Sequence, residues 1–215
     1  RSCLVGSEMC IRDSFGSECL TIADLDGDGL SEIISAKGYL SVIHYDPLGD
    51  VWHSETIGGP YNEDAEEEAF SGAHAEGVAV GDVDGDGENE IATVIEYFDS
   101  SSNVAPPGPI LIYDFRDGAW HESPIDTVDT SVIQDVAISD LDGDGRGEVV
   151  AAGHGFLAVY AFDGESWTQT LWSEDIQTER VVAGDIDLDG RGEFLSRPSH
   201  STGVAIVERE PGWTC

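Results

Sequence analysis

The stretch VAISDLDGDGRGEV, from Val136 to Val149, decides the fold, because it recurs four times along the chain. The other copies are LTIADLDGDGLSEI from Leu20, VAVGDVDGDGENEI from Val78 and VVAGDIDLDGRGEF from Val181, and all four align without a gap. The first aspartates of successive copies are 58, 58 and 45 residues apart. Repeats of this length are typical of β-propeller blades or of another repeat array.

Each copy contains the loop pattern D-x-D-x-D-G-x-x-E, with acids at positions 1, 3, 5 and 9. Calcium takes about 6–8 oxygen ligands, which closely spaced carboxylates can supply. Glycine at position 6 permits a sharp turn, and position 7 can offer its main-chain carbonyl, so its side chain is free to vary. We therefore predict about four Ca²⁺ ions, one in each loop. The predicted ligands, with position 7 acting through its carbonyl, are Asp24, Asp26, Asp28, Leu30 and Glu32 in loop 1; Asp82, Asp84, Asp86, Glu88 and Glu90 in loop 2; Asp140, Asp142, Asp144, Arg146 and Glu148 in loop 3; and Asp185, Asp187, Asp189, Arg191 and Glu193 in loop 4.

Two other interpretations of the loops explain less. An EF-hand begins in the same way but needs a glutamate at position 12, where this chain has Ser35, Thr93, Ala151 and Ser196. Asp-Gly turns without a metal would not require acids at positions 1, 3, 5 and 9 every time. Magnesium is the weaker candidate, because it prefers octahedral shells that keep several waters.

The segments around each loop have the alternation of short strands. Examples are EIATVIEY (90–97) and FLAVYAF (156–162), each rich in β-branched or aromatic residues. Four such strands joined by tight turns make an antiparallel blade, so we predict an all-β chain. The expected architecture is a β-propeller, with four four-stranded blades that are part of a larger ring. The tryptophans expected to pack between blades are Trp52, Trp120, Trp167 and Trp213.

The units resemble FG-GAP/VCBS repeats, the calcium-bearing blades of integrin α-subunit heads and of many secreted bacterial proteins. The resemblance covers about residues 16–215 and implies that the loop joins the first two strands of a blade and braces the fold. It also implies an extracellular or cell-surface location, with the periplasm as an alternative. This chain departs from the commonest pattern by having glutamate at position 9 and Leu188 in place of glycine at position 4. Neither change removes a ligand.

The expected domain organisation follows the repeats, which are predicted at about 16–57, 75–126, 132–173 and 177–215. Residues 1–15 contain a string that resembles translated sequencing-adapter read-through, and are expected to be a non-native or disordered leader of a fragment. The insertion at 58–74 is expected to be an acidic loop or short helix, and that at 98–109 an exposed loop. A disulfide between Cys3 and Cys10 is left open.

Composition excludes one class of partner. The chain has 44 acidic and 9 basic residues and a net charge of −35, so no basic face is available for nucleic acid. A membrane span is not expected, since no run of 18 apolar residues occurs. The acids can form a solubilising surface, bind metal, or do both; 16 of them are predicted carboxylate ligands in the four loops.

Two functions remain open from the sequence. The first is a non-catalytic module that binds a glycan or a protein through its loops or the mouth of a central channel. The alternative is part of a propeller-type carbohydrate-active enzyme, a polysaccharide lyase or a sugar dehydratase. No catalytic residue is predicted, although His74 and His154 could lie on one face. The polar residues six positions before each loop, either a ring at the channel or ordinary strand starts, are Glu18, Glu76, Gln134 and Glu179.

Overall fold

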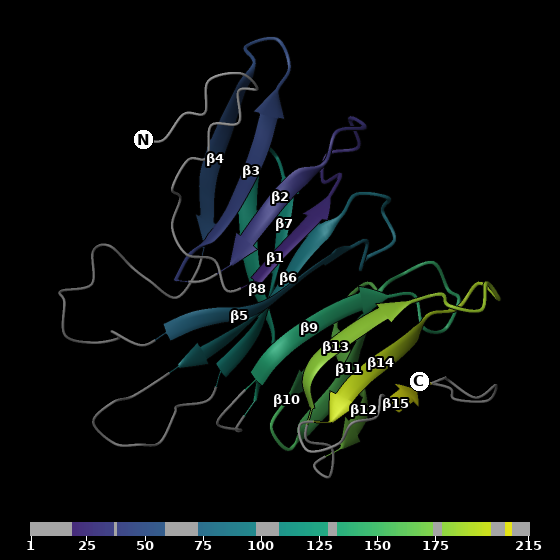
Figure 1. The fold of residues 1–215 in the computed structure, drawn as a ribbon. Coiled ribbons are helices and arrows are strands. Elements are labelled where there is room, and N and C mark those ends of the chain that lie inside the picture. Colours follow the sequence, from purple (N-terminus) through teal and green to yellow (C-terminus); the bar gives the residue numbers. More distant parts are fainter. Residues whose placement is uncertain are drawn as a thin grey trace, which may run out of the picture.

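The computed structural model describes residues 19–36, 38–58, 73–97, 108–128, 133–173, 178–198 and 205–207. The strands of these segments form four antiparallel sheets, which follow one another along the chain (Figure 1). Sheet 1 contains β1 (Cys19–Ala23), β2 (Glu32–Ala36), β3 (Leu40–Asp46) and β4 (Val51–Gly58). Sheet 2 contains β5 (Ala73–Gly81), β6 (Glu90–Tyr97), β7 (Gly108–Arg116) and β8 (Ala119–Val128). Sheet 3 contains β9 (Ile133–Ser139), β10 (Glu148–Gly153), β11 (Phe156–Phe162) and β12 (Trp167–Ser173), and sheet 4 contains β13 (Thr178–Gly184), β14 (Glu193–Pro198) and β15 (Ala205–Val207).

The strand order in every sheet is the order in the chain, so each sheet is a simple meander. This confirms the predicted all-β class and the antiparallel four-stranded unit for sheets 1 to 3. Sheet 4 has three strands in the described part of the chain. The predicted repeat bounds stay predictions, because the segments between sheets are not described. Other expectations also lie outside the described residues. They concern the leader 1–15, Cys3, Cys10, Glu18, Trp213, and the insertions over 59–72 and 98–107.

Successive sheets pack face to face through three apolar clusters. Side chains alternate between the two faces of the middle strands of sheet 3, so this sheet packs against a neighbouring sheet on each face. Phe156 and Tyr160 of β11 join the cluster shared with sheet 2, whereas Leu157 and Val159 join the cluster shared with sheet 4. Every residue of β10 is buried as a result. We call the face toward the preceding sheet the front face, and the face toward the following sheet the back face.

Aromatic side chains lie on the front faces. The Tyr113 ring of sheet 2 is fully buried and lies so close to Gly58 of sheet 1 that a side chain at Gly58 would overlap it. Trp120 and Trp167 pack against the clusters at the front faces of sheets 2 and 3, as predicted. Trp52, at the same place in sheet 1, is 49% exposed, so its predicted packing between sheets is wrong for the described residues.

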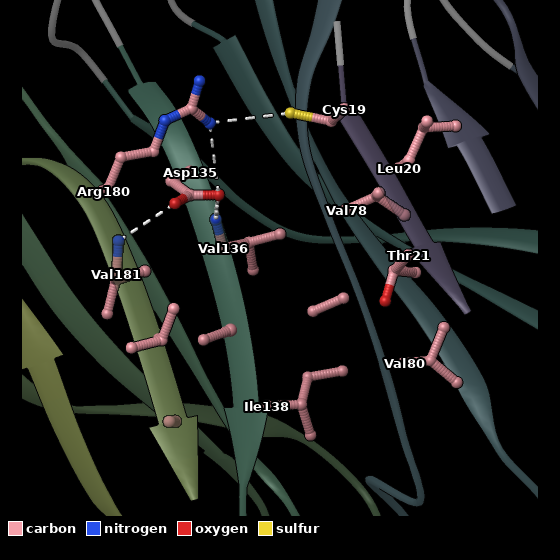
Figure 2. A pocket seen from close by; sticks show the side chains of 14 residues that line it. Cys19, Leu20, Thr21, Val78, Val80, Asp135, Val136, Ile138, Arg180 and Val181 are labelled. Atoms are coloured by element: carbon pink, nitrogen blue, oxygen red, sulfur yellow. Dashed lines mark hydrogen bonds and ion pairs between the residues drawn. The ribbon is translucent and has the colours of Figure 1, made fainter. Parts of the chain in front are cut away.

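The first strands of the four sheets, β1, β5, β9 and β13, line an open cavity of about 440 Å³. Its walls carry small apolar side chains such as Val78, Val136 and Val181. Figure 2 shows Arg180 at one end of this cavity, between Cys19 and Asp135. The first strands therefore form the inner edge of the assembly, and the acidic loops extend from the ends of these strands.

Candidate metal centres in the acidic loops

Each acidic loop is the connection of a β-hairpin. The residue before position 1 pairs with the position-9 glutamate, as in Gly81 with Glu90 and Ser139 with Glu148. The eight residues between these pairs turn the chain from the first strand of the sheet into the second. Strand pairing thus brings positions 1 and 9 together, which the sequence spacing alone could not establish.

Positive φ angles bend the loops at positions 4 and 6. Gly143 and Gly145 of loop 3 have φ of 79° and 91°, and the corresponding glycines of loops 1 and 2 are also left-handed. Leu188 occupies position 4 of loop 4 with φ of 64°, a conformation that disfavours a residue with a Cβ. The backbone path is therefore the same in all four loops, including the one that lacks the glycine.

The aspartates accept hydrogen bonds from the loop backbone in a pattern that repeats. In all four loops the position-6 N–H donates to the position-1 carboxylate, at 2.9–3.0 Å. The position-5 N–H donates to the position-3 carboxylate at 3.1 Å, and the position-7 N–H donates to the position-5 carboxylate at 2.7–2.9 Å. These bonds hold the carboxylates toward the inside of the turn.

The structure brings three carboxylates together in each loop, with one oxygen from each within 4.8 Å of the others. In loops 1, 3 and 4 the acids are those of positions 1, 3 and 9, and in loop 2 those of positions 1, 3 and 5. The predicted ligands outside these groups are Asp28, Glu90, Asp144 and Asp189. Their coordination and that of the position-7 carbonyls stay predictions.

The position-9 glutamates are the buried members of the sites. Glu90 and Glu148 are each only 3% exposed, and in every loop one carboxylate oxygen accepts the position-2 N–H at 2.6–2.9 Å. Burial, together with the nearby aspartates, raises the pKa of Glu90 to about 8 and that of Glu148 to about 7. Burial also raises the pKa of Asp84. Loops 2 and 3 therefore disfavour the charged form of these three carboxylates.

A divalent cation fits this arrangement. The donors are all oxygens, which suits a hard cation such as Ca²⁺. In loop 1 the Oδ1 atom of Asp24 is buried and has no hydrogen-bond partner, so it is available as a ligand. A cation among these groups would offset both the burial of the glutamates and the mutual repulsion of the acids.

A feature that the sequence reasoning missed is the contact between neighbouring loops. The position-8 residues Asn89, Gly147 and Gly192 each donate a hydrogen bond to the main-chain oxygen of position 1 in the preceding loop. Glycine at position 8 of loops 3 and 4 is the sequence feature that could have predicted the close approach of one loop backbone to the next. The acidic loops are thus a connected row rather than four separate turns.

The titratable and charged side chains that line the cavity at the first strands are Cys19, Asp135 and Arg180. The Asp135 carboxylate accepts hydrogen bonds from the Val181 and Val136 N–H groups at 2.9 and 3.1 Å and lies 3.9 Å from Arg180. Burial raises the pKa of the Cys19 thiol, which favours the protonated and less nucleophilic form. Glu76 and Gln134, predicted as part of a polar ring, are not among the residues that line the cavity.

The histidines form no pair that resembles a catalytic centre in the described residues. His154 is exposed in the turn after β10, whereas His74 lies in β5. His44 and His53 stack at 5.1 Å on neighbouring strands of sheet 1, where both are exposed. Among the described residues, no helix has the length and apolar character that a membrane crossing needs.

The fold and the loops define an all-β repeat protein with a carboxylate cluster at one end of each sheet. Residues 140–196, which include loops 3 and 4, match the model of the FG-GAP-like repeat family. This match confirms the resemblance of the repeat sequence to that family over these residues. A search of curated proteins gave no match.

Solved structures of rhamnogalacturonan lyases are similar to this chain. The lyase YesW matches 84% of the chain with a TM-score of 0.50 and 16% sequence identity. The PL11 lyase of Bacillus licheniformis gives a TM-score of 0.48 over 83% of the chain at 18% identity, and the exotype lyase YesX gives 0.49 over 83% at 17%. The chain covers 38–40% of these enzymes. The likeness to YesW shows the arrangement of strands alone.

Proposed function

We propose that this chain is an extracellular scaffold module in which Ca²⁺ ions, one in each acidic loop, fix the ends of successive β-propeller blades. The observation that carries the proposal is the buried glutamate at position 9, which in loops 1, 3 and 4 joins two aspartates in a group whose carboxylate oxygens lie within 4.8 Å of one another. Carboxylates at positions 1, 3, 5 and 9 and the position-7 carbonyl would supply the oxygens. Extracellular calcium is abundant enough for sites with Kd of about 10⁻⁴–10⁻³ M, so weak structural sites suffice there.

The test is calcium binding measured together with thermal unfolding. We expect about four ions per chain by calorimetric titration, and a higher melting temperature in millimolar calcium than in chelator. Magnesium at the same concentration should have a smaller effect, because its shell fits poorly. An identical melting curve with calcium and with chelator would remove the structural role.

The proposal that the sheets are propeller blades is supported by the faces of the two end sheets. Leu20 and Ile22 lie on the front face of sheet 1 and are 63% and 68% exposed. The residue of sheet 3 at the position of Leu20 is Val136, which is only 3% exposed against sheet 2. Val182 of sheet 4 is 62% exposed, whereas the residue at its position in sheet 3, Ala137, is buried in the cluster shared with sheet 4. Among the described residues, both end sheets thus present an interface face without a neighbour, as expected for part of a larger ring.

Matched substitutions on the two front faces test that idea. Val136→Ala should lower the free energy of unfolding by about 1–2 kcal/mol, because it removes buried apolar area. Leu20→Ala should cost less than about 0.5 kcal/mol in this chain, as is usual for exposed sites. Urea unfolding measures both. An equal cost at Leu20 would mean that the front face of sheet 1 is already covered.

The biological role that we propose is non-catalytic binding of a glycan or a protein, with calcium keeping the module rigid. A pectic polysaccharide is the first probe, because the chain shares its strand arrangement with a rhamnogalacturonan lyase. A glycan array followed by an assay for unsaturated sugar products separates binding from cleavage. Binding without product is expected; product that depends on His74 or His154 would favour the enzyme instead.

A further inference from the structure

The three contacts between neighbouring loops follow one rule. Gly147 N donates to the main-chain oxygen of Asp82 at 2.7 Å, and Gly192 N donates to that of Asp140 at 2.5 Å. The side-chain amide of Asn89 donates to the main-chain oxygen of Asp24 at 2.9 Å. In every case the donor is at position 8 of one loop and the acceptor at position 1 of the loop before it.

The shape of the backbone explains which residues can occupy position 8. A Cβ on Gly147 would overlap Ile138 and lie 3.1 Å from the Asp82 oxygen, and one on Gly192 would overlap Ser139. Glycine therefore permits the direct N–H contact in loops 3 and 4. Loop 2 uses the longer Asn89 side chain to reach the same acceptor.

The arginines at position 7 strengthen the same junctions. Arg146 of loop 3 packs against Gly85 of loop 2, and Arg191 of loop 4 packs against Gly143 of loop 3. Arg146 also donates from Nη1 to the Phe162 oxygen at the end of β11, at 3.1 Å. Position 4 of loops 2 and 3 thus contacts position 7 of the following loop, whereas Gly27 of loop 1 has no such contact.

We propose that cation binding is coupled from loop to loop, and that the position-8 donors Asn89, Gly147 and Gly192 are the positioning residues of this coupling. The inference rests on the calcium sites proposed above. The acceptor belongs to the residue whose carboxylate begins the preceding site, so ordering one loop fixes the first ligand of its neighbour. Coupling of this kind is reciprocal: a cation in either loop raises the affinity of the other.

The first experiment separates the loops by hydrogen exchange. Protection of residues 24–32 is followed by mass spectrometry as calcium is added to the whole chain, which gives a midpoint for loop 1. Asn89→Ala should raise that midpoint about three- to tenfold, the range that one hydrogen bond supports. Asn89→Gly should restore part of the loss, because glycine at position 8 donates through its N–H in loops 3 and 4.

The matched control is Ser54→Ala, an exposed change on β4 of sheet 1, the sheet that carries loop 1. It should leave the midpoint of loop 1 unchanged. An Asn89→Ala midpoint equal to the wild-type midpoint would overturn the coupling. Calcium protection that is absent from every loop would instead overturn the proposed metal sites, so the two failures are distinguishable.

A second variant tests the coupling by removing a predicted ligand and leaves the position-8 donors unchanged. Asp142→Ala removes a carboxylate from the cluster of loop 3, and should raise the calcium midpoints of loops 2 and 4 as well as its own. Protection of β10 and β11 in the same data reports whether sheet 3 remains folded. If loops 2 and 4 keep their wild-type midpoints while sheet 3 is folded, the loops are independent and the inference is wrong.

Discussion

In sheet 3, the body and the loop end are held by different forces. All six residues of β10 are buried and pack against two neighbouring sheets, whereas Gly143, Asp144 and Gly145 of loop 3 are exposed. Apolar burial removes the side chains of the body from water and stabilises it whether or not a metal is bound. The loop gathers carboxylates whose mutual repulsion a bound cation would offset. If the proposed calcium sites are correct, the sheets can form without metal, while the order of their loop ends depends on it.

The largest expected effect concerns the body of the sheet. Phe156→Ala removes a fully buried ring from the cluster between sheets 2 and 3, and should lower the free energy of unfolding by about 3–5 kcal/mol. Urea unfolding with calcium and with chelator should give the same loss. Leu48→Ala, at a side chain that is almost fully exposed, is the control and should cost almost nothing. A loss at Phe156 that disappears in chelator would mean that the body itself needs the metal.

The next effect concerns the loop. A site at one hundred times its Kd contributes about 2.7 kcal/mol by mass action, so Asp84→Ala should lose about that much in saturating calcium. In chelator the same change should be neutral or stabilising, because it relieves repulsion in the cluster of loop 2. Glu55→Ala, which removes an exposed carboxylate from β4, should show no such reversal. Thermal melts of both variants in calcium and in chelator measure whether the sign of the effect reverses.

The pH dependence of stability also distinguishes the loop ends from the body of the sheets. Folding raises the pKa of Glu90 to about 8 and of Glu148 to about 7, so between pH 4.5 and 8 the cation-free folded state binds protons that the unfolded chain has lost. The stability of the cation-free protein should therefore fall as pH rises through that interval. Calcium should abolish or reverse the slope, because it binds the deprotonated carboxylates.

Glu90→Gln provides the control for this dependence. The amide cannot titrate, so the slope of the cation-free variant should be flatter than that of the wild type. Urea unfolding at several pH values between 5 and 8 measures it. A wild-type stability that rises with pH without calcium would contradict the proposed burial cost.

The smallest effect concerns the loop that differs from the others. Leu188 has a left-handed backbone conformation and an almost fully exposed side chain, so the side chain contributes little packing. Leu188→Gly should stabilise the protein by up to about 1 kcal/mol, since it relieves the strain of a Cβ at positive φ. Gly143→Leu in loop 3 should have the opposite sign. Melting temperatures of the pair test whether loops 3 and 4 share one backbone path.

Much of this molecule could be predicted from the repeat. The alternation around each loop predicted strands, and the recurrence of acids predicted that carboxylates would cluster, because both depend on local spacing. The sequence could not predict that Gly147 approaches Asp82, or that Tyr113 lies against Gly58, since these contacts join residues from different sheets. The packing of Trp52 was mispredicted for the same reason: a repeat does not reveal which copy lacks a neighbour.

The central claim is that the acidic loops hold calcium, and a high-resolution crystal structure grown in millimolar calcium tests it most directly. The account predicts an ion in each of the four loops, with oxygens at about 2.3–2.6 Å and the position-9 glutamate among the ligands. Loops that contain only water under those conditions would contradict it.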